Sequence, residues 1–483
     1  MYFSNEDDPL KPHAEPHKWT YFLLVAIGVF MSTVDSSIVN LALPVIMADF
    51  AQPLTIMEWV VVSYLLTISA LLLTFGRLSD LRGRRWVYCR GFLVFILGSL
   101  LCSVAQSVWL LIAARAFQGV GAAMLMACSP AIVVDVFPPA ERGRALGMVG
   151  TVVAIGLTTG PALGGFILEH FSWRAIFYIN IPIGIVAFLA AARIMKGGPA
   201  DVARREAFDW LGALLLAAGL CAALYTLSHL QALIKAPVQA AAIALLALTA
   251  GGCFFWHEGR TPHPILDLAL LKVRIFTLPI ISAAILFAAL FTIVFLNPFY
   301  LLHPAGYTVD QAGLIMMVPF VLLSVISPLS GALADRMGSR LLCSLGMLLL
   351  SAALFAFSRL GPAATVVQLV WRLALAGLGI ALFLPPNNAA AMGSVPPRQR
   401  GTASGMVATA RNFGMVFGVA LAGTVFNLIF SRLSGGESLK VFRPELTHAF
   451  MSAYRTAMLV GCGMTAVGVV VALLRGRDAP SMR

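Results

Sequence analysis

Residues 76–85 read GRLSDLRGRR, and residues 331–340 read GALADRMGSR. Both segments follow a long apolar stretch, and both keep a glycine, an aspartate and a final arginine at the same spacing. Two further patterns recur 257 or 258 positions along the chain: Arg115, Gly119 and Gly121 return as Arg372, Gly377 and Gly379, and PPAERGRALGMV (138–149) returns as PPRQRGTASGMV (396–407). Three repeats at nearly one offset predict two related halves, and a site between such halves is typical of transporters.

The composition indicates a membrane protein. Hydrophobic residues make up 60% of the 483 positions and charged residues only 11%, whereas soluble chains carry about 25% charged residues. A helix crosses the bilayer core with roughly 20 apolar residues, and lipid offers no partner to unpaired backbone groups. We therefore expect an all-α polytopic bundle of 14 transmembrane helices, near 20–47, 56–75, 86–105, 108–135, 144–168, 174–193, 208–229, 236–256, 274–302, 311–333, 340–358, 364–392, 401–430 and 449–474.

Alternate connections between these spans are rich in arginine. The rich set includes Arg77, Arg82, Arg84, Arg85, Arg142, Arg144, Arg193, Arg260, Arg274, Arg336, Arg340, Arg398, Arg400, Arg475 and Arg477. Positively charged loops stay in the cytoplasm, so both termini are predicted there and the chain in the inner (plasma) membrane. The net charge of +12 then reflects these loops and not nucleic-acid binding, which needs basic tracts with interleaved aromatics.

The repeat sets the expected domain organisation. Each set of six spans takes up less chain than the repeat offset, and the two spans between 205 and 257 account for the difference. The predicted arrangement is 6+2+6: a cytoplasmic tail (1–18), an N-terminal six-helix half (19–195), two inserted linker helices (205–257), a C-terminal six-helix half (272–475) and a second cytoplasmic tail (476–483).

No metal site is expected. The seven cysteines lie in or beside apolar runs without a C-x-x-C pair, which favours small buried side chains over metal ligands. His13 and His17 fall in the N-terminal tail and are interpreted as solvated.

Several motifs resemble the major facilitator superfamily and, within it, the fourteen-span drug:proton antiporters of the EmrB/QacA type. They are VDSSIVNLALP (34–44), the 76–85 loop, Arg115 to Gly121, GLTTGPALGG (156–165) and WRAIFYINIPIG (173–184). The resemblance extends from Val34 to Phe426, with Ser37 in place of the usual threonine and Glu58 in place of glutamine. It implies the major facilitator fold, and the family associates the 156–165 motif with export.

Asp35 is the candidate proton carrier. It is the only carboxylate deep inside a predicted span, whereas Glu58, Asp135, Asp209 and Asp310 lie near span ends, where we expect water to reach them. A charge at mid-bilayer costs at least about 2.5 kcal/mol, so a purely structural role is a poor explanation. Arg115 is the matching deep cation and could hold Asp35 directly or through water. Two structural alternatives stay open: a polar residue satisfied by helix packing, and an arginine bonded to backbone carbonyls.

A second group of residues is predicted to shape gating. Glycines at i, i+4 spacing let helices approach closely, and proline bends a helix. We further expect Asp80 to cap the helix starting near Gly401 and Asp335 the helix starting near Gly143, with Arg84 reaching the lipid headgroups. The gating and structural candidates are Gly76, Asp80, Gly83, Arg84, Gly156, Gly160, Pro161, Gly164, Gly165 and Asp335.

A central cavity is expected to bind the substrate. Its predicted polar lining is Asn40, Tyr64, Gln118, Asn297, Asn387, Asn388 and Arg411, with Arg372 as another deep cation. Aromatic side chains such as Phe291 and Phe295 could surround a lipophilic cation, although helix-spaced aromatics also serve plain packing. With Asp35 as the one deep acid, we expect a monovalent cation to compete with one proton.

The sequence thus predicts a secondary transporter, not an enzyme, that exports small amphipathic compounds in exchange for protons. It needs no cofactor beyond the proton gradient, and its partners are the small-molecule substrate, protons and the lipid bilayer, with a periplasmic adaptor protein left open. The alternatives are an importer or symporter of the same fold, and less favoured, a membrane enzyme or a non-transporting receptor. An enzyme should show clustered acids, histidines or a nucleophile at one depth.

Overall fold

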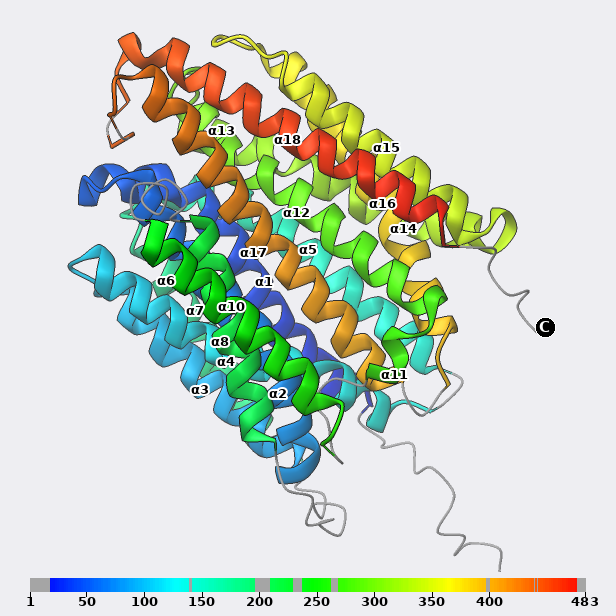
Figure 1. The fold of residues 1–483 in the computed structure, drawn as a ribbon. Helices are drawn as coiled ribbons and strands as arrows, with labels where there is room; N and C mark the ends of the chain where they lie inside the picture. The colour runs from blue at the N-terminus through cyan, green and yellow to red at the C-terminus, as the bar shows by residue number, and fades with distance from the viewer. Residues whose placement is uncertain are drawn as a thin grey trace, which may run out of the picture.

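The computed structural model of the chain is all-helical (Figure 1). It describes residues 18–138, 141–195, 209–228, 237–261, 268–396, 400–437, 439–440 and 442–475. The long helices are α1 (Lys18–Phe50), α2 (Leu54–Arg82), α3 (Arg84–Ser103), α4 (Val108–Val136), α5 (Arg142–His170), α7 (Asn180–Ile194), α8 (Trp210–Ser228), α10 (Pro237–Glu258), α12 (Arg274–Leu302), α14 (Val318–Met337), α15 (Ser339–Phe357), α16 (Val366–Gly393), α17 (Arg400–Leu433) and α18 (Thr447–Leu473). Shorter ones are α6 (Ala175–Tyr178), α11 (Leu268–Leu271), α13 (Val309–Met316) and the 3-10 turn η2 (Pro444–Leu446).

Thirteen helical spans within the described residues are long and apolar enough to cross a bilayer. Two of them are interrupted: α6 continues into α7, and α13 into α14, where Pro319 follows the break at Met317 and has no backbone N–H to donate. The span predicted at 208–229 corresponds to α8 (Trp210–Ser228), in which the described apolar stretch covers Trp210–Ala223. The all-helical membrane fold is confirmed, with thirteen such spans among the described residues; a fourteenth crossing stays a prediction.

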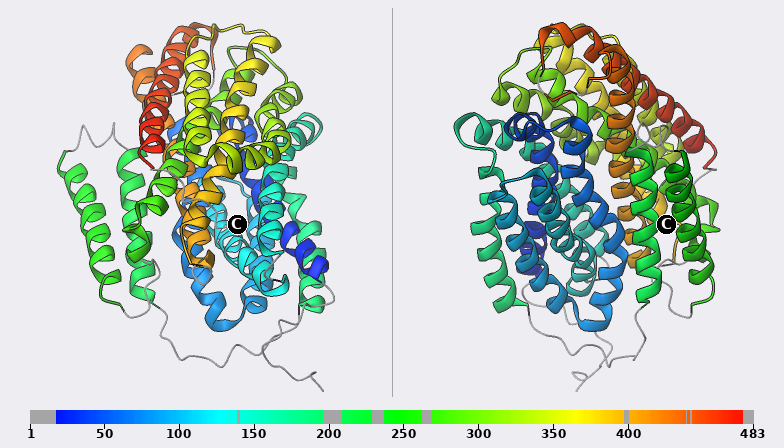
Figure 2. Two further views of the ribbon diagram at one scale, coloured as in Figure 1. Left: turned by 90° about the vertical axis from the view of Figure 1, so that its right-hand side faces the viewer. Right: turned by 60° about the vertical axis from the view of Figure 1, so that its left-hand side comes forward.

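The helices form two bodies that follow the order of the chain. Helices α1 to α7 pack mainly with one another, as do α12 and α14 to α18. Figure 2 shows the first body, coloured blue to teal, beside the second, which runs from green to red. The bodies meet where α2 packs on α17, α5 on α13 and α14, and α1 on α12. Helices α8 and α10 pair with each other at one edge of the bundle, where α8 touches α2 and α17 (Figure 2).

α1 starts and α18 ends at the same end of the bundle, called here the basic end. It is defined by Arg84, Arg142, Arg274 and Arg475 at the ends of their helices. The Lys18 ammonium lies 2.7 Å from a carboxylate oxygen of Glu141 at the start of α5, and Arg274 donates to the carbonyl of Leu474 at 2.6 Å. The opposite end of the bundle is called the far end.

Glycines bring α5 against α1 and α13. A Cβ on Gly156 or Gly160 would collide with the hydroxyl of Thr33 or Ser37, and one on Gly164 would lie 2.7 Å from Ile38. Such backbone proximity is what a small-residue stripe permits. Toward the far end, a Cβ on Gly165 would lie 3.0 Å from the Cα of Asp310. The motif at 156–165 therefore holds α5 on α1 in its own half and on α13 in the other.

Candidate functional site

Asp35 lies at the centre of a sealed polar cluster between α1, α4 and α7. One carboxylate oxygen contacts the guanidinium of Arg115, and both side chains are 0% exposed. The other oxygen accepts hydrogen bonds from the Gln118 amide at 2.9 Å and the Asn180 amide at 3.0 Å. All three partners donate, which is the environment that an ionised carboxylate accepts.

Arg115 is held from several sides. Its Nε donates to the carbonyl of Val60 at 3.1 Å, and Nη1 also donates to the Gln118 side-chain oxygen at 2.6 Å. The guanidinium lies 4.0 Å from the ring centroid of Tyr64, whose hydroxyl donates to the carbonyl of Ser32 at 3.0 Å. Arg115 thus binds both Asp35 and a backbone carbonyl. The two interpretations of Arg115 that the sequence left open, a partner of Asp35 and a cation held by backbone carbonyls, therefore both apply in this structure.

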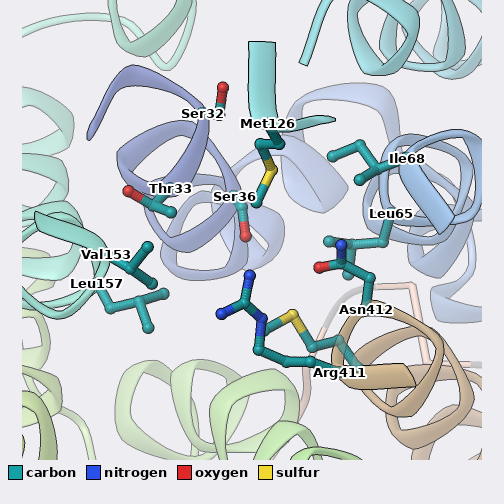
Figure 3. A pocket seen from close by; sticks show the side chains of 11 residues that line it. Ser32, Thr33, Ser36, Leu65, Ile68, Met126, Val153, Leu157, Arg411 and Asn412 are labelled. Atoms are coloured by element: carbon teal, nitrogen blue, oxygen red, sulfur yellow. The ribbon is translucent and has the colours of Figure 1, made fainter. Parts of the chain in front are cut away.

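Two small adjoining cavities lie between the halves, of about 20 and about 50 Å³. Arg411 of α17 lines both, together with Val153, Leu157 and Met415. In Figure 3 the Arg411 guanidinium points toward Ser36 of α1, the residue that follows Asp35. Drug-sized ligands occupy about 300–1,000 Å³, so the structure is a closed conformation in which the halves must separate to admit a substrate.

Of the seven residues predicted to line the substrate cavity, Asn388 and Arg411 line these two cavities. Hydrogen bonds engage the other five elsewhere in this closed structure, and the lining of the opened cavity stays a prediction. Tyr64 and Gln118 belong to the Asp35 cluster, and Asn40 donates to the carbonyl of Ser36 at 2.7 Å. Asn297 accepts from the Tyr454 hydroxyl at 2.6 Å. Asn387 contacts the guanidinium of Arg475.

Three charged residues differ in solvent exposure from the prediction. Glu58 is 0% exposed, and its carboxylate lies against Gly423 of α17. Asp209 is buried with the His257 ring at 2.8 Å. Arg372, expected to be deep, is half-buried near the start of α16 and donates to the carbonyls of Ala356 and Gln368.

Arg84 does not extend to the headgroups as predicted. Its guanidinium donates to the carbonyl of Ala131 at 2.6 Å and contacts Asp135, so it fastens the turn after α2 to α4. Gly83 permits that turn with φ of 91°, a backbone conformation that favours glycine. The described partner of Asp80 is Arg84, at 3.7 Å.

The two predicted helix caps stay predictions. The side chains of Asp335, Gly143 and residues 400–402 lie outside the described part of the structure. Gly76 lies one turn before Asp80 on α2 with open space at its Cα, and Pro161 lies inside α5 between the two helix contacts of that motif.

The sequence analysis did not predict the roles of Asn180 and Ser99 in the Asp35 cluster, nor the burial of Arg475. Asn180 starts α7 and donates to Asp35, and Ser99 of α3 accepts from Gln118 at 2.9 Å. Asn180 belongs to the conspicuous 173–184 motif, which was the available signal. Arg475 is 1% exposed and is hydrogen-bonded to Ser339 and Asn387, although hydropathy places it just past the last span.

A buried arginine–carboxylate pair inside a two-bodied bundle of membrane-spanning helices is the architecture of a secondary transporter. Residues 25–418 and, in a second overlapping match, 279–483 match the Major Facilitator Superfamily, and the chain belongs to this family. It is a multi-pass membrane transporter, which confirms the prediction that it is not an enzyme.

Relatives and solved structures agree with this assignment. The chain is 35% identical over 410 residues to the riboflavin transporter RibZ of Clostridioides difficile, covering 85% of this chain and 88% of the relative. It is 36% identical over 409 residues to multidrug resistance protein Stp of Mycobacterium tuberculosis, covering 83% and 75%. The fold is similar to an inward-facing, occupied bacterial homolog of the human lysosomal transporter Spinster (TM-score 0.68, 15% identity, 96% and 98% covered) and to a D-xylose–proton symporter (TM-score 0.64, 14% identity, 96% and 98% covered).

Proposed function

We propose that the protein exports small amphipathic compounds in exchange for protons, by alternating access between its two halves. The observation that carries the proposal is the buried Asp35–Arg115 pair and its place next to the cavity. Ser36, the residue after Asp35 on α1, lines the cavity between the halves. A carboxylate with no solvent contact is costly to keep charged in a membrane. If Asp35 alternates between contact with Arg115 and binding of a proton, this costly buried carboxylate serves to carry the proton.

In the proposed cycle, one turn of α1 couples proton and substrate. Ser32 and Ser36 line the cavity, Asp35 lies between them in sequence, and the Ser32 carbonyl accepts from Tyr64, which packs on Arg115. Substrate entering from the cytoplasm beside Ser32 and Ser36 shifts this turn so that Arg115 and the amide donors engage Asp35, and the carboxyl releases its proton to the cytoplasm. After the halves open outward and the substrate leaves, these donors loosen and the carboxyl takes a proton from the outside.

The proposal includes a finer assignment to the fourteen-span drug:proton antiporters. In this reading α8 is a fourteenth crossing, α8 and α10 are inserted at the lipid-facing edge, and the plan is 6+2+6. The basic end is then cytoplasmic, since its connections carry the arginines. Where a second membrane surrounds the cell, a periplasmic adaptor protein would receive the compound at the far end.

Export is favoured by two observations. The glycine motif of α5, which the family associates with antiport, packs on α1 and α13, and the relative Stp is named a multidrug resistance protein. Uptake of a specific compound is the second candidate, because the relative RibZ is named a riboflavin transporter.

Transport in proteoliposomes tests the function and its direction. The purified chain is reconstituted with a pyrene-labelled amphipathic compound, and the pH gradient is imposed in both directions. Exchange predicts that the compound accumulates in the more acidic compartment and that a protonophore abolishes this. A symporter would move the compound down the proton gradient, and a protein that moves no compound in either arrangement would refute transport by proton coupling.

A further inference from the structure

We propose that the cavity beside Arg411 binds the anionic group of its substrate, so that the protein prefers amphipathic aromatic anions to cations. The inference rests on the proposed function and names the substrate class of that same cavity. It replaces the cation preference expected from the sequence, because that expectation assumed that Asp35 faces the substrate.

Asp35 is not available to a substrate in this structure. Its carboxylate is 0% exposed and engaged by Arg115, Gln118 and Asn180. It lines neither cavity among the residues described. The negative charge of Asp35 is also matched by the guanidinium of Arg115, so this cluster presents no net charge to the cavity.

Arg411 is the charged side chain that does line the cavities. Among the described residues, none of the carboxylates lines either cavity or lies within ion-pair distance of Arg411. Its Nε is buried without a hydrogen-bond partner in the described structure, and its described electrostatic contact is the ring of Phe287, 5.9 Å from the guanidinium carbon. A buried cation without a counter-charge is unfavourable, and an incoming carboxylate or sulfonate can supply that charge through paired N–H···O bonds.

Nearby groups complete a site for such a ligand. Asn412, the next residue on α17, has a buried amide nitrogen without an acceptor, and Ser36 presents a hydroxyl toward Arg411 (Figure 3). The second cavity is walled by Phe287, Phe320 and mostly aliphatic side chains, with Asn388, whose buried amide oxygen has no donor in the described structure, as its polar member beside Arg411. An anionic head at Arg411 and a flat aromatic body against Phe287 and Phe320 would occupy the two cavities together once the halves separate.

Three compounds that share one ring system test the preference: 1-pyrenecarboxylate, 1-pyrenecarboxamide and 1-pyrenemethylammonium. Binding is measured by pyrene fluorescence anisotropy to the full chain in detergent micelles. We expect the carboxylate to bind at least about tenfold more tightly than the carboxamide, and the ammonium most weakly, because a charged hydrogen-bonded pair is replaced by a neutral or repulsive one.

The variants locate the effect. Arg411→Gln should abolish the preference for the carboxylate, and Arg411→Lys, which keeps the charge and the fold, should retain a smaller preference. Arg372→Gln is the matched control, since Arg372 is half-buried in the same half, donates to two backbone carbonyls, lies over the Trp371 ring and lines neither cavity. This variant should bind like wild type. Equal or tighter binding of the ammonium by wild type, absence of carboxylate binding, or a preference that survives Arg411→Gln would overturn the proposal.

Failure of this inference and failure of the proposed function give different results. In proteoliposomes, pH-driven transport of the ammonium but not the carboxylate retains the exporter and overturns the anion site. Absence of pH-driven transport for all three compounds, with the carboxylate still binding through Arg411, retains the anion site and counts against proton exchange.

Discussion

The carboxylate of Asp35 and the guanidinium of Arg115 touch in a site where neither side chain is exposed. The pair joins α1 to α4, and Gln118 and Asn180 complete the shell around the carboxylate. Separating this pair without compensation is unfavourable. In the proposed exchange, this contact is what links a proton on Asp35 to a movement between α1 and α4.

Removing Arg115 alone should destabilise the protein more than removing both charges. Arg115→Gln leaves a buried carboxylate without its cation, a change that costs about 3–5 kcal/mol in buried pairs. The double variant Asp35→Asn, Arg115→Gln should recover much of this loss, as measured by thermal unfolding in detergent. Strictly additive effects would mean that the two side chains do not interact in the folded protein.

Gly160→Ala should weaken the packing of α5 on α1. The new Cβ collides with the Ser37 hydroxyl, and overpacking costs about 1–3 kcal/mol. Gly147→Ala on the same helix is the control, because no atom lies within 4 Å of its Cβ position. Adding Ser37→Gly to Gly160→Ala should restore part of the stability and transport. A Gly160→Ala protein as stable and active as Gly147→Ala would rule out this contact.

Export of an anion should respond to membrane voltage. Moving a monoanion outward and one proton inward transfers two charges, worth about 4.6 kcal/mol per 100 mV. A potassium diffusion potential, negative on the substrate side, should therefore speed pyrenecarboxylate transport at equal pH. Pyrenemethylammonium exchanged for one proton should show no such response. Voltage-insensitive transport of the carboxylate would contradict one-for-one exchange.

Helices α8 and α10 should face lipid and not the substrate. Their large exposed side chains include Leu214, Leu245 and Leu248. A lipid-soluble carbene reagent, activated by light and mapped by mass spectrometry, should label peptides from both helices strongly. The peptide at 34–44, buried in α1, should stay nearly unlabelled. Protection of α8 and α10 by substrate would place them on the pathway and overturn the 6+2+6 plan.

The membrane helices and the central charged pair could be predicted from the sequence, because hydropathy shows which residues lie far inside an apolar run. Asp35 and Arg115 stand out as charges far inside apolar runs, and the structure brings their side chains into contact. Depth near span ends was harder to judge. Glu58 and Arg475 lie close to the ends of their helices, and tertiary neighbours that hydropathy does not reveal bury them.

The polar cavity residues were the least predictable part. Asn387 and Asn388 are adjacent, yet Asn387 contacts Arg475 while Asn388 lines the cavity with Arg411. Successive helix residues point about 100° apart, so which one faces the substrate depends on helix rotation. Asn180 of α7 lies 145 residues after Asp35 in the sequence, and only the packing of α7 on α1 brings its amide to the carboxylate.

Proton coupling through Asp35 is the central claim, and pH-driven transport by Asp35→Asn tests it most directly. The variant is reconstituted beside wild type and beside Asp49→Asn, which changes a half-exposed acid at the far end of the same helix. A pH gradient is imposed without voltage, and movement of the pyrene compounds is followed. We expect Asp35→Asn to fold and bind substrate but to lose gradient-driven transport, keeping at most downhill exchange, while Asp49→Asn transports like wild type. Uphill transport by Asp35→Asn at the wild-type rate would show that Asp35 does not carry the proton.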